Sequence, residues 1–79
     1  MAQEINIPKL GSEMKTGTIL EWHVKVGDHV EEDQELCTIK TEKMNAEVES
    51  LYDGTIIEIT GEVGKTYNVG EVIGRIEED

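Results

Sequence analysis

Lys43 is the residue of this sequence best placed for covalent chemistry, at the centre of the stretch Thr41-Glu42-Lys43-Met44-Asn45. Lysine carries a nucleophilic amine on a long, flexible stem, so it is the side chain to which a carrier group can be joined through an amide. A lysine beside a strand also has an ordinary interpretation, as a solvated charge that discourages edge pairing. The residues around Lys43 decide between these two interpretations.

The flanking residues predict that Lys43 lies at the tip of a β-hairpin. One strand-like run ends at Lys40, and another begins at Ala46. Two such runs joined by a short polar segment are typical of a hairpin. We therefore expect the Lys43 amine to project from a turn and not from the face of a strand.

Other side chains offer less chemistry. His23 and His29 have acidic neighbours, but no Cys and no third His completes a zinc set. The acidic run 31–33 lacks the ligand spacing of an EF-hand loop, and no Ser or Cys stands in a nucleophile-elbow motif. We expect no metal site, no catalytic residue and no enzymatic activity in the chain itself.

The charge balance restricts the possible partners. Eighteen acidic residues against seven Lys and Arg give a formal charge of −11, which repels nucleic acids and anionic membrane surfaces. No apolar run is long enough to span a membrane, and the N-terminus lacks the basic start and apolar core of a secretory signal. The single Cys37 stands among apolar residues, which favours a buried free thiol in a reducing compartment.

An ungapped internal repeat organises the chain. Residues 17–21 (Gly-Thr-Ile-Leu-Glu) match residues 54–58 (Gly-Thr-Ile-Ile-Glu), and Val-Gly at 26–27 matches Val-Gly at 63–64, all at an offset of 37. Two similar halves, about 1–40 and 41–79, are implied. Each half holds short strands rich in Val, Ile and Leu, and neither can bury its apolar face alone.

These observations predict one all-β domain over residues 1–79. We expect a flattened barrel or sandwich of two small antiparallel sheets related by a pseudo-two-fold axis. In that arrangement the Lys43 hairpin lies at one end and the chain termini at the other. Such a domain would display Lys43 at the end opposite its chain termini.

Several packing expectations follow from the strand pattern. Leu20, Trp22 and Val24 should share one face, with Trp22 in or beside the core. Val26 and Val63, equivalent in the repeat, should both be buried. The repeated glycines should serve turns and bulges; they are Gly17, Gly27, Gly54 and Gly64.

The motifs together resemble the biotinyl/lipoyl domain family. They are Pro8-x-Leu10-Gly11-x-x-Met14-x-x-Gly17-x-Ile19, Trp22-x-Val24-x-x-Gly27-Asp28-x-Val30, Thr41-Glu42-Lys43-Met44, Gly54-x-Ile56, Gly64 and Val69-Gly70. The resemblance spans essentially the whole chain. It implies the family's fold and a covalent group on Lys43.

Within the family, the sequence is most similar to the lipoyl domains of 2-oxo acid and acetoin dehydrogenase acyltransferase components. Those domains usually carry Asp-Lys-Ala at the hairpin, whereas biotinyl domains carry Met-Lys-Met. Here Glu42 supplies the acid of the first motif, and Met44 matches half of the second. The acid, together with the Gly11-to-Gly17 loop and its Met14, favours lipoate over biotin. Glu42 and Met44 would be the flanking residues that a modifying enzyme recognises.

The resemblance also implies a set of partners. A lipoate ligase or lipoyl transferase would modify Lys43. A thiamine-diphosphate-dependent enzyme, an acyltransferase core and a flavoprotein dihydrolipoamide dehydrogenase would then use the swinging arm in turn. The Gly11-to-Thr16 loop is either a partner-recognition surface, as in family lipoyl domains, or a plain connector. The isolated domain is expected to be a monomer and cytoplasmic, or in the mitochondrial matrix after processing if eukaryotic.

Two alternatives remain open at the level of sequence. The first is a biotin carboxyl carrier domain of a biotin-dependent carboxylase, on the same fold. The second is an interaction module that kept the fold without being modified, in which Lys43 would be a surface charge. The mass of the intact protein distinguishes all three.

Overall fold

The computed structural model describes residues 1–79. Its regular elements are strands: β1 (Ala2–Asn6), β2 (Thr16–Trp22), β3 (His29–Val30), β4 (Glu35–Lys40), β5 (Asn45–Glu49), β6 (Gly54–Ile59), β7 (Thr66–Asn68) and β8 (Val72–Glu78). The structure contains no apolar helix of membrane-spanning length. The predicted all-β class is confirmed.

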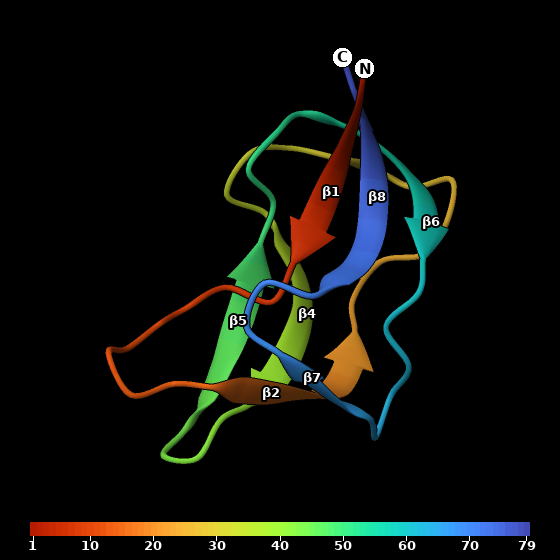
Figure 1. The fold of residues 1–79 in the computed structure, drawn as a ribbon. Coiled ribbons are helices and arrows are strands. Elements are labelled where there is room, and N and C mark those ends of the chain that lie inside the picture. The colour runs from red at the N-terminus through yellow and green to blue at the C-terminus, as the bar shows by residue number, and fades with distance from the viewer.

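The strands form two antiparallel sheets of four strands each (Figure 1). One sheet has the order β1-β8-β6-β3, and the other has the order β5-β4-β2-β7. Each sheet therefore takes two strands from residues 1–40 and two from residues 41–79. The halves interleave and do not form one sheet each, so neither half keeps a complete sheet when the other is removed.

The pairing register repeats along with the sequence. Ile19 faces Ile39 between β2 and β4, and Ile56 faces Ile76 between β6 and β8. A bulge follows Ile19 in the first pair and Ile56 in the second. All these positions are separated by the offset found in the sequence, which confirms the pseudo-two-fold symmetry.

The core is built almost entirely from branched aliphatic side chains contributed by both sheets. Its twelve members are Ile5, Ile7, Ile19, Val24, Val30, Leu36, Cys37, Ile39, Val48, Ile56, Ile73 and Ile76. Branched side chains of this kind suit a thin layer between two pleated surfaces. The burial predicted for Cys37 is confirmed.

The bulge in β2 corrects one packing expectation. Trp22 is half-buried against the core, and its indole N–H donates to the Gly61 carbonyl at 2.8 Å. Val24 is buried, but Leu20 is exposed, so the prediction that all three share a face is wrong for Leu20. The extra residue of the bulge shifts the alternation, which leaves Leu20 and Glu21 facing solvent.

The expected burial of Val26 and Val63 is also wrong. Their exposed fractions are 58% and 62%, because each lies in a turn, directly before the glycine of that turn. At these positions the repeat preserves backbone hydrogen bonds between the two halves. The Gly27 N–H donates to the Ile56 carbonyl, and the Gly64 N–H donates to the Ile19 carbonyl, each at 2.8 Å. Both glycines have positive φ, as expected for turns.

Gly17 and Gly54 have a different role from the predicted one. They lie inside β2 and β6, where neighbouring groups approach the backbone closely. A Cβ on Gly54 would lie 2.2 Å from the Glu77 carbonyl oxygen, whereas one on Gly17 would lie 3.2 Å from the Ile39 Cδ1. Close contact with the backbone of a paired strand therefore requires glycine at Gly54, whereas Gly17 only packs tightly against a side chain, and neither glycine serves a turn.

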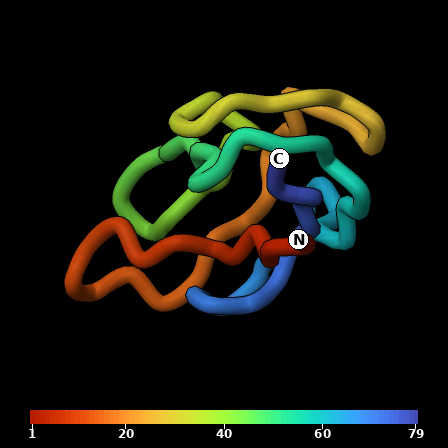
Figure 2. Tube along the Cα trace, turned by 90° about the horizontal axis from the view of Figure 1, so that it is seen from above, coloured from red at the N-terminus to blue at the C-terminus, as the bar shows by residue number.

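The β4–β5 hairpin and the chain termini lie at opposite ends of the molecule, as predicted (Figure 1). The molecule measures 34 × 22 × 17 Å along its principal axes, and its elongated shape is compatible with this separation of the hairpin from the termini. At the terminal end the Met1 amino group pairs with the Glu77 carboxylate. Seen from the terminal end, the segment between β1 and β2 extends to one side (Figure 2).

Candidate functional site

The site is the tip of the β4–β5 hairpin. The last ladder pair joins Lys40 to Asn45, and the Thr41 N–H then donates to the Met44 carbonyl at 2.8 Å. Glu42 and Lys43 occupy the two central positions of the resulting turn, and neither has a positive φ. Ordinary side chains therefore fit both positions without backbone strain. The structure confirms that Lys43 lies at a hairpin tip.

Thr41 organises this turn with its hydroxyl. The Thr41 Oγ1 donates to the Met44 carbonyl at 2.8 Å, and it accepts from the N–H of Met44 at 3.2 Å and of Lys43 at 3.4 Å. Sequence reasoning did not assign this role. The available signal was a threonine at the first position of a turn, where hydroxyls commonly bond to the backbone.

The Lys43 amine is open to solvent. Its side chain is 80% exposed, and its Nζ lies 3.6 Å from the Glu13 Oε2, whose side chain is 79% exposed. An ion pair this exposed contributes little to stability because water and salt screen it. Acylation of the amine removes the lysine charge and with it this ion pair. The sequence did not predict the contact between Glu13 and Lys43, because that contact depends on the path of a loop.

A hollow of about 290 Å³ separates the hairpin from the loop between β1 and β2. Leu10, Gly11 and Met14 line it from the loop, and Met44 and Ala46 line it from the hairpin. The Leu10 N–H contacts the Met14 Sδ at 3.3 Å, which folds the loop upon itself. The Gly11-to-Thr16 loop is therefore one wall of the site, and its recognition by a partner stays a prediction.

Glu42 and Met44 both present their side chains to solvent. The Glu42 carboxylate takes part in no ion pair or hydrogen bond, and Met44 is among the exposed large apolar residues of the chain. Both flank an exposed amine on a rigid frame of two paired strands. They are accessible to an enzyme that must recognise the folded hairpin.

The two histidines lie elsewhere and do not converge. The His23 Nε2 contacts the Thr38 Oγ1 at 2.7 Å and the Glu47 Oε1 at 3.1 Å. The His29 Nε2 lies 3.0 Å from the Asp79 Oδ2, and this hydrogen bond raises the pKa of His29. No group of three His, Cys, Asp or Glu side chains is arranged to hold a metal ion.

Cys37 is buried beside the core and is not part of the site. Burial raises the pKa of the Cys37 thiol to about 12, and the nearby negative charge of Glu47 adds to the effect. A thiol in that state is protonated at neutral pH and unreactive. The chain's one sulfhydryl is thus a packing group.

The arrangement fits a group attached through an amide to Lys43. The amine is uncovered, the hairpin that bears it is anchored in a four-stranded sheet, and an apolar hollow adjoins it. The site therefore suits a carrier, in which the protein places the group and other active sites act on it.

A family model supports this class directly. The biotin/lipoyl model, described as "Biotin-requiring enzyme", matches residues 3–76. The chain belongs to the biotinyl/lipoyl domain family. Its relatives place it among the lipoyl-type members, which are non-catalytic carrier domains.

Two relatives are acyltransferase components of dehydrogenase complexes. The chain is 43% identical over 75 residues to the lipoamide acyltransferase component of the branched-chain alpha-keto acid dehydrogenase complex of Bacillus subtilis (strain 168), which covers 95% of this chain and 18% of that protein. It is 41% identical over 75 residues to the dihydrolipoyllysine-residue acetyltransferase component of the pyruvate dehydrogenase complex of Corynebacterium glutamicum, covering 95% of this chain and 11% of that protein. The chain thus spans less than a fifth of either relative.

One solved structure aligns with this chain over almost the full length of both proteins. The lipoyl domain of the 2-oxoglutarate dehydrogenase complex of Azotobacter vinelandii aligns with a TM-score of 0.71 and 34% identity. The alignment covers 94% of this chain and 96% of that chain. The predicted resemblance to lipoyl domains of acyltransferase components is confirmed.

Proposed function

We propose that Lys43 carries a lipoyl group in amide linkage and serves as a swinging arm of a 2-oxo acid or acetoin dehydrogenase complex. The arm carries acyl groups and electrons between the active sites of that complex. The observation that carries this proposal is the exposed Lys43 amine at the tip of the β4–β5 hairpin, at the end of the molecule opposite the termini. When bound, the lipoyl group supplies a dithiolane that accepts both the acyl group and two electrons.

Lipoate is favoured over biotin by two independent features. The relatives are named as acyltransferase components, and the similar solved structure is a lipoyl domain. Glu42 places a negative charge beside the target amine. A biotin ligase whose surface fits the first methionine of Met-Lys-Met would have to remove water from that charge. An unpaired charge buried in this way costs a few kcal/mol, on the order of a hundredfold in specificity.

The chain's own residues perform placement. Strands β4 and β5 hold the hairpin, and the Thr41 hydroxyl fixes the backbone on both sides of the turn. The termini, where a tether to a larger protein would join, lie at the far end. A tethered domain meets each partner at an effective concentration in roughly the millimolar range for a short flexible linker. The hairpin therefore faces away from its own attachment to the complex.

The proposed partners follow from this role. They are a lipoate ligase or lipoyl transferase, a thiamine-diphosphate-dependent dehydrogenase component, an acyltransferase core and a flavoprotein dihydrolipoamide dehydrogenase. The relatives belong to complexes acting on different 2-oxo acids, so the proposal extends to the class and not to one substrate. The formal charge of −11 favours monomers, since copies repel one another. We place the protein in the cytoplasm, or in the mitochondrial matrix of a eukaryotic source.

Competition between two ligases tests the identity of the group. The parent protein is incubated with lipoate ligase or with biotin ligase, and its intact mass is recorded. A lipoyl adduct adds about 188 Da and a biotinyl adduct about 226 Da, as the sums of the atoms gained. We expect lipoylation of the parent. Efficient biotinylation without lipoylation would support the biotin carrier alternative, and no adduct from either enzyme would support the unmodified module.

The flanking acid provides a matched variant for the same assay. Glu42→Met completes the biotin-type motif with Met44 and should let biotin ligase act on the hairpin. Glu49→Met, a control on the same strand pair but outside the tip, should leave the preference of the parent unchanged. An equal gain of biotinylation in both variants would mean that Glu42 does not discriminate between the ligases.

A further inference from the structure

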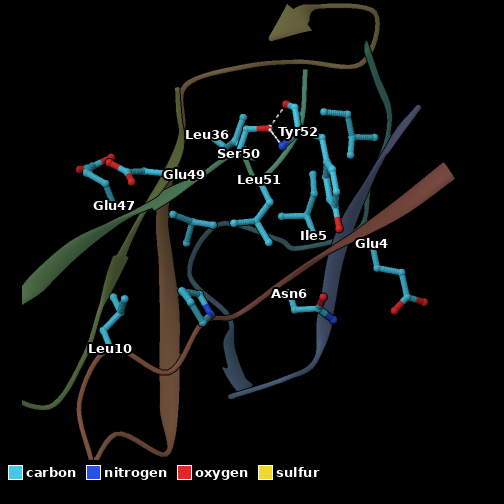
Figure 3. Close-up of a pocket in the computed structure, with 13 residues that line it drawn as sticks. Glu4, Ile5, Asn6, Leu10, Leu36, Glu47, Glu49, Ser50, Leu51 and Tyr52 are labelled. Atoms are coloured by element: carbon cyan, nitrogen blue, oxygen red, sulfur yellow. Dashed lines mark hydrogen bonds between the residues drawn. The ribbon is translucent and has the colours of Figure 1, made fainter. Parts of the chain in front are cut away.

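A second hollow, of about 230 Å³, is lined mainly by residues of β1, of β5 and of the turn that follows β5 (Figure 3). It opens between β1, an edge strand of one sheet, and β5, an edge strand of the other. Its floor is apolar and buried, formed by Ile5, Leu36 and Val48. Each of its two walls is a strand with a partner on one side only, so each has a free edge toward the hollow.

Leu51 stands exposed at this hollow and is held there by a fixed turn. Its exposed fraction is 72%, and it points into the space between the two edge strands (Figure 3). The buried Ser50 Oγ donates to the Tyr52 carbonyl at 2.6 Å and accepts from the Tyr52 N–H at 3.2 Å. The Ser50 N–H donates to the Gln34 carbonyl at 2.8 Å. An apolar side chain is therefore presented to solvent by an ordered backbone.

Acidic side chains border the hollow on both sides. Glu47 and Glu49 alternate with the buried Val48 on β5, so they lie on the outer face of the sheet while Val48 faces inward. Glu4 borders the hollow on β1. Glu4 lies 3.8 Å from Arg75, and Glu47 accepts from Thr38 at 2.7 Å, whereas the Glu49 carboxylate has no ion pair or hydrogen bond.

We propose that this groove binds an extended segment of a partner protein in which basic and branched apolar residues alternate. The segment adds as a strand to the free edge of β5. Its apolar side chains enter the groove beside Val48 and Leu51, and its basic side chains lie on the outer face opposite Glu49. Backbone hydrogen bonds along the edge supply affinity in such strand addition, and alternate side chains supply specificity.

Charge and size select this occupant over others. A second copy of the chain, a nucleic acid or an anionic membrane would add like charge to a molecule of formal charge −11. The volume of 230 Å³ is below the roughly 300–1,000 Å³ of small-molecule sites, so it holds one or two apolar side chains and not a cofactor. A cationic, apolar strand satisfies both restrictions.

The groove meets the carrier site at one residue. Leu10 lines both this groove and the hollow beside Lys43. A segment docked on β5 would therefore end beside the hairpin that bears Lys43. Docking here would orient a partner toward the carrier lysine without contacting it, and it requires no modification of the lysine.

Two peptides of identical composition test the proposal. The first is capped Lys-Val-Lys-Val-Lys-Val and the second is capped Lys-Lys-Lys-Val-Val-Val, each titrated into the 79-residue chain and followed by NMR. We expect the alternating peptide to bind about tenfold more tightly, with amide shifts at Glu47, Glu49 and Leu51. Equal affinity, or shifts confined to other strands, would overturn the proposal by showing general charge attraction only.

Surface variants sharpen the test without unfolding the protein. Leu51→Ser should weaken the alternating peptide about tenfold, and Glu49→Gln should weaken it about threefold at low salt. The matched controls Val63→Ser and Glu32→Gln, exposed and outside the groove, should bind like the parent. Lys43→Gln should also bind like the parent, which separates this proposal from the carrier function. Parent-like binding by both Leu51→Ser and Glu49→Gln would overturn it.

Discussion

The Nζ of Lys43 lies 3.6 Å from the Oε2 of Glu13, although thirty positions separate the two residues in the chain. This ion pair joins the hairpin tip to the loop between β1 and β2. Figures 1 and 2 show that loop and the hairpin extending from the same side of the molecule. The unmodified site is therefore formed by two segments, and the charge of Lys43 is one of the links between them.

The Lys43–Glu13 ion pair should be electrostatically weak and should depend on the free amine. Glu13→Gln should change the free energy of unfolding by less than about 0.5 kcal/mol, because both groups are exposed to solvent. Acylation of Lys43 should shift the amide resonances of Glu13 and Met14 in the parent and much less in Glu13→Gln. Urea titration and NMR measure the two effects. Equal shifts in both proteins would show that the ion pair does not couple the loop to the hairpin.

The two glycines equivalent in the repeat should respond differently to a methyl group. Gly54→Ala should destabilise the fold by roughly 3 kcal/mol, because its Cβ would lie 2.2 Å from the Glu77 carbonyl oxygen of a paired strand. Gly17→Ala should cost no more than about 1 kcal/mol, because the Ile39 side chain can move by a few tenths of an ångström. Thermal unfolding of both variants compares them. A larger loss in Gly17→Ala would contradict the register described for β6 and β8.

The Thr41 hydroxyl should govern the order of the turn. Thr41→Val keeps the shape of the side chain but removes its hydrogen bonds to Met44 and Lys43, at a cost of about 1 kcal/mol. Amide exchange at Met44 should become faster. Thr16→Val, at a hydroxyl with no hydrogen bond, should leave that exchange rate unchanged. An unaltered Met44 rate in Thr41→Val would mean that the backbone pairing alone fixes the tip.

The buried thiol should make stability fall in alkaline solution. The unfolded chain releases the Cys37 proton near the ordinary pKa of 9.0, while the folded chain keeps it up to about 12. The unfolded state therefore binds fewer protons above pH 9, so this contribution to stability is complete below pH 9 and is lost as the pH rises toward 12. Cys37→Ala should lose less stability over that range than the parent. Parallel pH profiles by urea unfolding would contradict the burial of the thiol.

The repeat allowed most of the architecture to be predicted from the sequence. The offset of 37 identified the halves, the opposed ends and the position of the hairpin, since these depend on the order of strands and turns. The repeated glycines suggested turns or bulges at Gly17 and Gly54, but the bulges follow Ile19 and Ile56, because no marker in the sequence places the extra residue that reverses the alternation. The exposure of Val26 and Val63 has a related cause, because repetition preserved a turn and not a core position.

The candidate site was predictable only in part. Lys43, Glu42 and Met44 are adjacent in the chain, so the hairpin pattern brought them together. Glu13, Leu10 and Met14 join them through the path of a loop that follows β1, which local patterns do not specify. The groove at Leu51 was also missed, because it arises where edges of two different sheets face each other.

The most direct test of the carrier proposal is to locate the adduct among the six lysines of the chain. The protein is treated with lipoate ligase and digested, and tandem mass spectrometry assigns the modified residue. We predict that every adduct lies on Lys43 and that Lys40→Gln is modified like the parent. Lys43→Gln should stay folded and accept no group, because an exposed turn residue contributes little stability. An adduct on any other lysine, or one that persists in folded Lys43→Gln, would contradict the central claim.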